Sequence, residues 1–166
     1  MTRGAAFLLI AAALLAPGLV IGPGLDAAVF SHVGGRLLDG VTPYVGSWDH
    51  KPPGIYLADA GAQAILGWLG AWTADWLVTL AATAGIGMAV AVALARLGVA
   101  GWPRWLAAGG AVAFAAQYLV ALGGGLTEAP AGVLAGAALA LGLSGGSRGQ
   151  LLATGAMLGL WQPKAK

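Results

Sequence analysis

Long apolar runs separated by short polar stretches organise this chain. They cover residues 5–21, 55–69, 76–97, 105–122, 129–143 and 151–161. A helix that crosses a bilayer needs about 20 mostly apolar residues, with roughly 17 to 25 usual. Most of the runs approach or meet this length, whereas the last is short and is interpreted as a helix interrupted by the end of the sequence. The pattern predicts an all-α integral membrane protein with about five transmembrane helices.

The run at 55–69 differs from the others because it carries regularly spaced polar side chains. Tyr56, Asp59 and Gln63 stand at i, i+3 and i+7, so a helix would place them on one face. A span exposed to lipid would have to bury Asp59 in hydrocarbon. We therefore predict an amphipathic juxtamembrane helix that does not cross the membrane.

The segment before this run also alternates with a helical period. Its apolar positions are Phe30, Val33 and Leu37, and its polar positions are His32, Arg36 and Asp39. This pattern predicts a second juxtamembrane helix, ended by Gly40. Residues 22–70 would then form one outer loop with two juxtamembrane helices, within a single membrane domain that covers residues 1–166.

The positions of the arginines favour this topology. If 55–69 does not cross, the arginines of the short loops are all cytoplasmic, as the positive-inside rule requires, and the flanking acids are together outside. The arginines are Arg3, Arg96, Arg104 and Arg148, and the acids are Asp26 and Glu128. If 55–69 crosses, Arg96 and Arg104 move outside, against the rule.

The first run has no clear small-x-small cleavage site and is interpreted as an uncleaved spanning helix.

The composition agrees with a membrane protein. The chain has 166 residues, of which 59% are hydrophobic and 8% charged, and its mean hydropathy is +0.84. Soluble domains average roughly 45 to 50% apolar and about 25% charged residues. A net charge of +2 rests on so few charged side chains that nucleic-acid binding does not follow. The absence of cysteine excludes disulfides and thiolate metal sites.

The most polar stretch of the chain is Asp49-His50-Lys51-Pro52-Pro53. Its prolines keep Lys51 out of the α region, so the ammonium is presented with little conformational freedom to lose. A phosphate of a lipid head group or of a lipid-linked donor is a suitable partner. The alternative is an interfacial lysine, with Trp48 and Tyr44 as aromatic anchors. His50 could carry a proton or serve a structural role.

Two acids stand at the outer ends of predicted membrane helices. Taken singly, Asp26 could cap a helix and Glu128 could complement a helix dipole. Together they could act as a general base and an orienting group. They could also hold a divalent cation through oxygen ligands, although the sequence predicts no dedicated metal site.

The region from Asp26 to Tyr56, after an N-terminal membrane helix, resembles the start of GT-C glycosyltransferases. The closest resemblance is to the bacterial branch akin to protein O-mannosyltransferases and the lipid A aminoarabinose transferase. It rests on Asp26-Ala27-Ala28-Val29-Phe30, Arg36-Leu37-Leu38-Asp39-Gly40, Pro43-Tyr44 and Trp48-Asp49-His50-Lys51-Pro52-Pro53-Gly54-Ile55-Tyr56.

The resemblance implies an enzyme of the bacterial inner membrane. It would transfer a sugar, with inversion, from a polyprenyl-phosphate carrier to a lipid or protein acceptor on the extracytoplasmic face. Asp26 would activate or position the acceptor, Lys51 would bind the donor phosphate and Glu128 would complete the site. The remaining residues expected to bind substrate are Asp49, His50, Arg36 and Tyr44.

Two departures from the family pattern leave an alternative open. The family usually has Asp-Glu where this chain has Asp26-Ala27, and its members have more membrane helices than 166 residues can form. We therefore expect an N-terminal fragment, a truncated gene product or a short homologue of such an enzyme. The alternative is a non-catalytic membrane subunit that binds lipid or packs in a larger complex.

Overall fold

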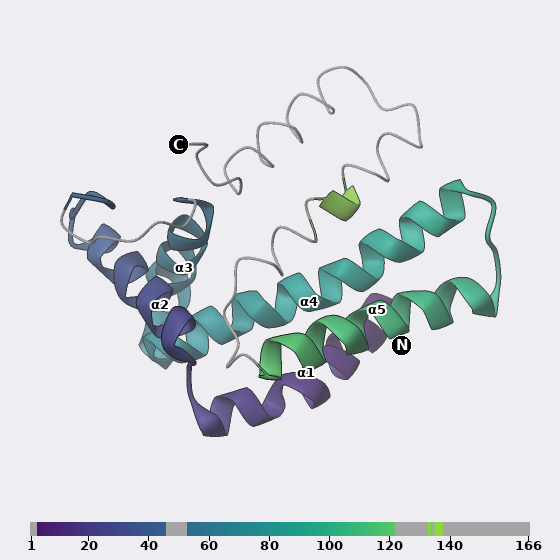
Figure 1. Ribbon diagram of the computed structural model, residues 1–166, viewed down its shortest axis with the longest axis horizontal. Coiled ribbons are helices and arrows are strands. Elements are labelled where there is room, and N and C mark those ends of the chain that lie inside the picture. Colours follow the sequence, from purple (N-terminus) through teal and green to yellow (C-terminus); the bar gives the residue numbers. More distant parts are fainter. Residues whose placement is uncertain (1–2, 46–52, 122–132, 134, 138–166) are drawn as a thin grey trace, which may run out of the picture.

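The computed structural model describes residues 3–45, 53–121, 133 and 135–137, and this part of the chain is helical without strands (Figure 1). The elements in order are α1 (Arg3–Ile21), α2 (Leu25–Leu38), α3 (Pro53–Leu66), the 3₁₀ helix η1 (Gly67–Leu69), α4 (Ala71–Arg96) and α5 (Trp102–Ala121). The all-α prediction is thus confirmed for the described residues. The helix predicted at 129–143 is described only at 133 and 135–137, and that at 151–161 lies outside the described residues.

The three long helices α1, α4 and α5 pack against one another in one bundle (Figure 1). Small residues allow their backbones to approach closely. A Cβ added to Gly87 of α4 would lie 2.5 Å from a methyl carbon of Val112 in α5 and 3.3 Å from the Phe7 ring in α1. Alanines 11, 84, 91 and 108 are buried in the same cluster. Close packing of this kind holds helices together where no hydrophobic force acts between them.

The helices α2 and α3 form a separate pair at one end of the bundle. The chain leaves α1 through Gly22, whose φ of +87° suits glycine, and α2 then runs at 85° to α1. The helix α3 packs on α2 and on the first turns of α4. With 14 residues it is about 21 Å long, too short to cross a bilayer. The predicted loop at 22–70 therefore does contain two short helices.

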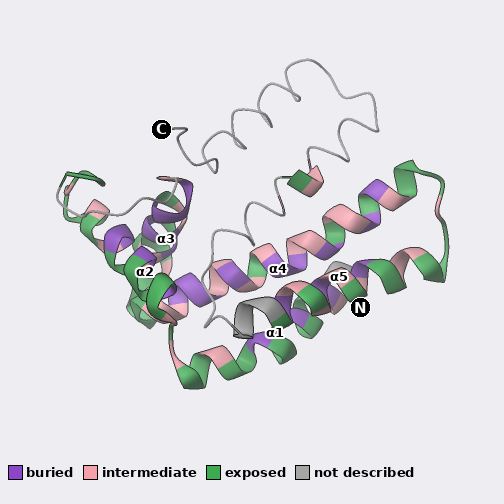
Figure 2. Cartoon of the chain, viewed as in Figure 1, coloured by how far each residue is buried: buried purple, intermediate pink, exposed green. Residues whose placement is uncertain are grey.

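Two tryptophan side chains join the start of α4 to the end of α1. The Trp76 indole N–H donates to the Leu15 carbonyl at 3.1 Å, and the Trp72 N–H donates to the Gly18 carbonyl at 3.3 Å. Trp76 also packs in a buried cluster with Phe30 of α2 and Tyr56 of α3. Figure 2 shows buried positions on all of these helices where they meet. These contacts fix the pair of short helices on the bundle.

The crossing of α2 and α3 depends on Gly34. A Cβ at this position would lie 2.9 Å from the Asp59 Cβ and 3.0 Å from the Ala60 backbone nitrogen. Glycine inside a helix costs about 1 kcal/mol relative to alanine. Here the missing side chain lets the two backbones touch, so the buried contact compensates for that cost.

Few of the described helices are long and apolar enough to be candidate membrane spans. The 26-residue α4 is long and apolar enough to cross a bilayer on its own, whereas α1 and α2 pass the same test only together, across their bend. The described residues thus provide one such helix, or two if the bent pair is a single span, in place of the five predicted.

Alanine at Gly34 should destabilise the protein even though alanine favours helices. The added methyl group would have to displace backbone atoms of α3, and overpacking of this kind costs about 1–3 kcal/mol. Gly61→Ala is a matched control, because nothing lies within 4 Å of its added Cβ, and it should be neutral or stabilising. Unfolding of both purified variants in detergent tests this. Unfolding of Gly34→Ala at or above the wild-type midpoint would contradict the packing argument.

Candidate functional site

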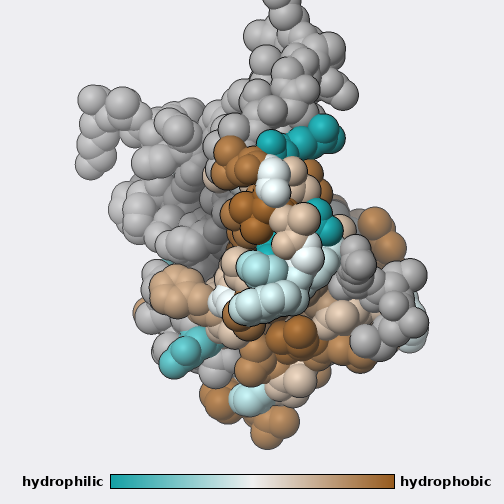
Figure 3. All heavy atoms as spheres, turned by 90° about the vertical axis from the view of Figure 1, so that its right-hand side faces the viewer, coloured by the Kyte–Doolittle hydropathy of each residue, from teal (hydrophilic) through white to brown (hydrophobic). Residues whose placement is uncertain are grey.

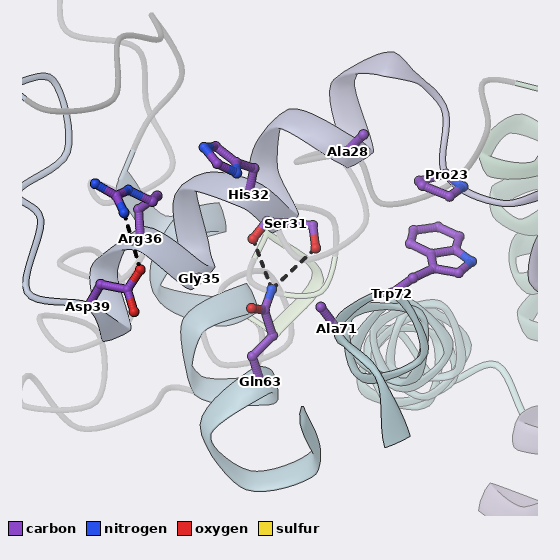
Figure 4. Close-up of a pocket in the computed structure, with 10 residues that line it drawn as sticks. All are labelled: Pro23, Ala28, Ser31, His32, Gly35, Arg36, Asp39, Gln63, Ala71 and Trp72. Atoms are coloured by element: carbon purple, nitrogen blue, oxygen red, sulfur yellow. Dashed lines mark hydrogen bonds and ion pairs between the residues drawn. The ribbon is translucent and has the colours of Figure 1, made fainter. Parts of the chain in front are cut away.

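A groove of about 610 Å³, lined by both apolar and polar side chains, lies between α2, α3 and the start of α4. It is lined by Pro23, Ala28, Ser31, His32, Gly35, Arg36, Asp39, Gln63, Ala71 and Trp72 (Figure 4). Small-molecule sites in proteins usually measure roughly 300–1,000 Å³. The volume of the groove lies within this range, and the groove is therefore a candidate site.

One wall of the groove is the polar face of α2. Its apolar face, with Phe30 and Val33, is buried, whereas His32 and Arg36 are exposed. Arg36 Nη1 lies 3.4 Å from Asp39 Oδ2, and these side chains are 44% and 63% exposed. An exposed ion pair contributes little to stability. Both charged groups thus remain open to a ligand in the groove.

The floor of the groove is the amide of Gln63. Its nitrogen Nε2 donates toward the Ser31 carbonyl at 3.0 Å, the Ser31 hydroxyl at 3.2 Å and the two Asp75 carboxylate oxygens at 3.2 and 3.1 Å. A backbone carbonyl can only accept, so the nitrogen of the amide must be the end that faces Ser31. The amide therefore links α3 to both α2 and α4.

This orientation leaves the amide oxygen Oε1 on the Gly35 side of the groove (Figure 4). A Cβ added to Gly35 would lie 3.2 Å from this oxygen. No hydrogen bond from a described residue to Oε1 is formed in the structure. Gln63 thus presents a fixed hydrogen-bond acceptor at the groove, and Gly35 provides the space for it.

Two buried carboxyl groups lie beneath this floor. Asp59 is 5% exposed and Asp75 is 3% exposed, and among the described residues neither forms an ion pair with a basic side chain. Burial, together with the neighbouring charge of Asp75, raises the pKa of Asp59 from 3.8 to about 8. Asp59 is therefore mostly protonated at neutral pH, while Asp75 accepts hydrogen bonds from Gln63.

A metal centre is not formed by this part of the chain. Among the described residues, no group of three or more His, Cys, Asp or Glu side chains could hold a metal ion. The divalent cation considered from the sequence would involve Asp26 and Glu128. Glu128 lies outside the described residues, so that pairing remains a hypothesis.

Only some of the predicted site residues line the groove. Asp26 is exposed in the first turn of α2 but does not line the groove, and the N-cap is Gly24, so Asp26 does not cap the helix. Arg36 does line the groove. Tyr44 has a positive φ of 68°, and its ring lies 6.1 Å from the Tyr56 ring, away from the groove lining. The predicted Asp49, His50, Lys51 and Glu128 lie outside the described residues.

The sequence reasoning missed several residues of the groove and its support. Gln63 and Asp59 were predicted only to share one polar face of a helix. Their neighbours at the groove, Ser31, Trp72 and Asp75, were not predicted as site residues. Asp75 stands just before the apolar run that begins at residue 76, in the sequence Thr73-Ala74-Asp75-Trp76. The position of this acid at the edge of a predicted span was the signal that could have identified it as a site residue.

Comparison of the chain with known protein families, with curated protein sequences and with solved structures gives no significant match.

Stability should depend on pH through Asp59. Because the folded protein holds this proton more tightly than the unfolded chain, stability should fall as pH rises from about 4 to about 8 and then level off. Asp59→Asn removes the titrating group and should flatten this part of the profile. Denaturant unfolding of wild type and variant at several pH values between 4 and 9 would measure it. Identical slopes in the two proteins would show that Asp59 does not titrate as described.

Proposed function

We propose that the chain is the N-terminal membrane module, or a short homologue, of a GT-C glycosyltransferase that uses a polyprenyl-phosphate-linked sugar. The observation that carries the proposal is the order of the helices. A long helix turns by 85° into two short packed helices, and a long apolar helix returns antiparallel to the first. The resemblance of residues 26–56 to such enzymes implies this arrangement, with juxtamembrane helices in the first outer loop.

The distribution of charge supports insertion in a membrane. At one end of the bundle α1 starts at Arg3, α4 ends at Arg96 and α5 begins with Arg104 in its first turn. Contact between the Phe7 and Trp105 rings, whose centroids are 6.0 Å apart, joins these helix ends. The acids of the described residues, Asp26, Asp39, Asp59 and Asp75, belong to α2, α3 and the start of α4 at the other end. By the positive-inside rule the arginine-rich end is cytoplasmic.

Exposed apolar side chains give further support. Those on α1 include Leu9, Val20 and Ile21, which are 58%, 90% and 75% exposed, and those on α5 include Trp102 and Phe114, at 74% and 76%. Viewed from the α4–α5 turn, hydrophobic atoms cover much of the described surface (Figure 3). Exposed apolar side chains that gather on a surface mark sites of contact with membranes or other proteins. Lipid chains are the solvent that suits such a surface.

The proposed chemistry is attack of an acceptor hydroxyl on C1 of the sugar, with the carrier phosphate as leaving group. Asp26 would accept the hydroxyl proton or hold the acceptor. Lys51 precedes the first residue of α3, Pro53, by two positions, and the N-terminus of a helix favours anions. Lys51 would therefore balance the charge on the departing phosphate.

A second candidate is a non-catalytic subunit that binds the carrier lipid. It is favoured by Ala27, which stands where the family has a second acid and is only 3% exposed. The side chain at this position lies on the buried face of α2, with Phe30 and Val33, and is not accessible to a substrate. In this alternative the same face binds lipid without transferring the sugar.

Cysteine labelling tests the topology, because the chain has no cysteine of its own. Thr42 follows α2 and Ala100 lies in the α4–α5 turn, and both are exposed. A membrane-impermeant maleimide added to intact cells should label Thr42→Cys but should label Ala100→Cys only after permeabilisation. Labelling of both from the same side would overturn the proposed orientation.

Sugar transfer tests the enzymatic proposal. Asp26→Asn and Lys51→Ala should each reduce transfer from a radiolabelled polyprenyl-phosphate sugar by about 10²-fold or more, because a general base and a charge-balancing group are lost. The assay uses membranes that contain the protein with its natural partners. Gln117→Ala on the exposed face of α5 is the control and should leave transfer and membrane insertion unchanged.

Full activity in both site variants would reject the assignment. If wild type transfers no sugar but binds the carrier lipid, and Lys51→Ala weakens this binding, the non-catalytic candidate is correct.

A further inference from the structure

The floor of the groove carries hydrogen-bond acceptors. The amide oxygen of Gln63 is held there because the amide nitrogen is already bound to Ser31 and Asp75. The Asp39 carboxylate adds two more acceptors at the rim. A ligand in this groove must therefore bring donors such as hydroxyl groups.

One edge of the groove is a fixed aromatic surface. The Trp72 indole N–H is bound to the Gly18 carbonyl at 3.3 Å, so the ring is anchored to α1 and its N–H is already used. The side chain is partly buried and lines the groove beside Ala71 (Figure 4). What the indole presents there is its flat, largely apolar surface.

Donors stand on the wall opposite the floor. Arg36 and His32 line the groove from α2, and the Arg36 guanidinium keeps further N–H groups beyond the one that faces Asp39. The groove thus combines acceptors, donors and a flat apolar surface. A sugar ring fits this combination, since it has hydroxyls that donate and accept around its edge and C–H groups on its faces.

A phosphate fits this groove poorly. It would face the Gln63 amide oxygen and the Asp39 carboxylate, which repel or fail to pair with an acceptor-only anion. The cation in reach, Arg36, already shares its charge with Asp39 at 3.4 Å. We therefore assign the carrier phosphate to the proposed Lys51 and not to the groove.

We propose that the groove formed by Gln63, Ser31, Arg36 and Asp39, with Trp72 at its edge, binds a sugar ring. This inference rests on the proposed function, which it deepens by separating the subsite for the sugar from that for the carrier phosphate. The sugar is either the one linked to the carrier or one on the acceptor, and the chemistry of recognition is the same for both.

The sharpest test changes the groove without removing a polar group. Gly35→Ala places a methyl group 3.2 Å from Gln63 Oε1, so the amide oxygen must shift by a few tenths of an ångström. Gly61→Ala on α3 is its control, with open space around the added Cβ. Gln63→Ala removes the acceptor, with Gln117→Ala as control, and Trp72→Leu removes the flat ring, with Trp102→Leu as control.

Binding is measured by saturation-transfer NMR on the protein in a phosphocholine detergent, which carries no sugar head group. The probes are methyl glycosides of glucose, galactose and mannose, polyprenyl phosphate, and polyprenyl phosphate that carries a hexose. At least one glycoside should bind, and Gln63→Ala, Gly35→Ala and Trp72→Leu should weaken it by about three- to tenfold, as expected for one or two lost contacts. The three control variants should bind as wild type does.

The source of the sugar follows from the carrier probes. If the hexose strengthens binding of the carrier and Gln63→Ala abolishes this gain, the groove holds the donor sugar. If a free glycoside binds in the groove but the hexose adds nothing to the carrier, the groove holds the acceptor sugar. Either result supports the proposal.

Other results overturn it. The sugar subsite is rejected if no glycoside binds, or if the groove variants and their controls bind glycosides equally well. It is also rejected if Gln63→Ala abolishes binding of bare polyprenyl phosphate. If the carrier still binds through Lys51 in those cases, the proposed function stands without the groove. If glycosides bind as expected but the carrier does not bind, the groove stands and the proposed function fails. Circular dichroism of each variant verifies that the fold is retained.

Discussion

The hydrogen bonds of the Gln63 amide hold together the part of the molecule where chemistry is expected. One nitrogen joins the backbone and hydroxyl of Ser31 in α2 to the carboxylate of Asp75 in α4. Polar groups in a poorly hydrated interior interact strongly when paired and are costly when left unpaired. This one side chain therefore links α2, α3 and α4, and it helps to set the shape of the groove above it.

Close packing supports the same junction from two sides. Gly34 lets α2 touch the backbone of α3, and the indoles of Trp72 and Trp76 bind carbonyl groups near the end of α1. Neither contact depends on the release of water from apolar surface. Such interactions are the ones that remain effective where helices are surrounded by hydrocarbon. The junction is thus built from contacts suited to the proposed environment.

Periodicity predicted the two short helices well, because it reports which faces of a local segment are apolar. The spacing of Tyr56, Asp59 and Gln63 correctly placed these residues on one face of a short helix. It could not reveal Asp75 as the partner of Gln63, since that pairing joins two helices across η1 and a change of direction. Asp26 was expected in the site with Arg36, yet only Arg36 lines the groove. The face of α2 that lines the groove is set by tertiary packing, which the periodicity of a local segment does not predict.

The bend after Ile21 has a consequence for how a ligand would arrive. In the proposed membrane orientation, with α1 along the membrane normal, the turn of 85° would lay α2 nearly in the plane of the bilayer surface. The groove along α2 would then open at the depth of the lipid head groups. A substrate anchored by a polyprenyl chain is confined to that layer, so its encounter with the groove is a search in two dimensions. Its local concentration there, rather than its concentration in solution, would set the rate of capture.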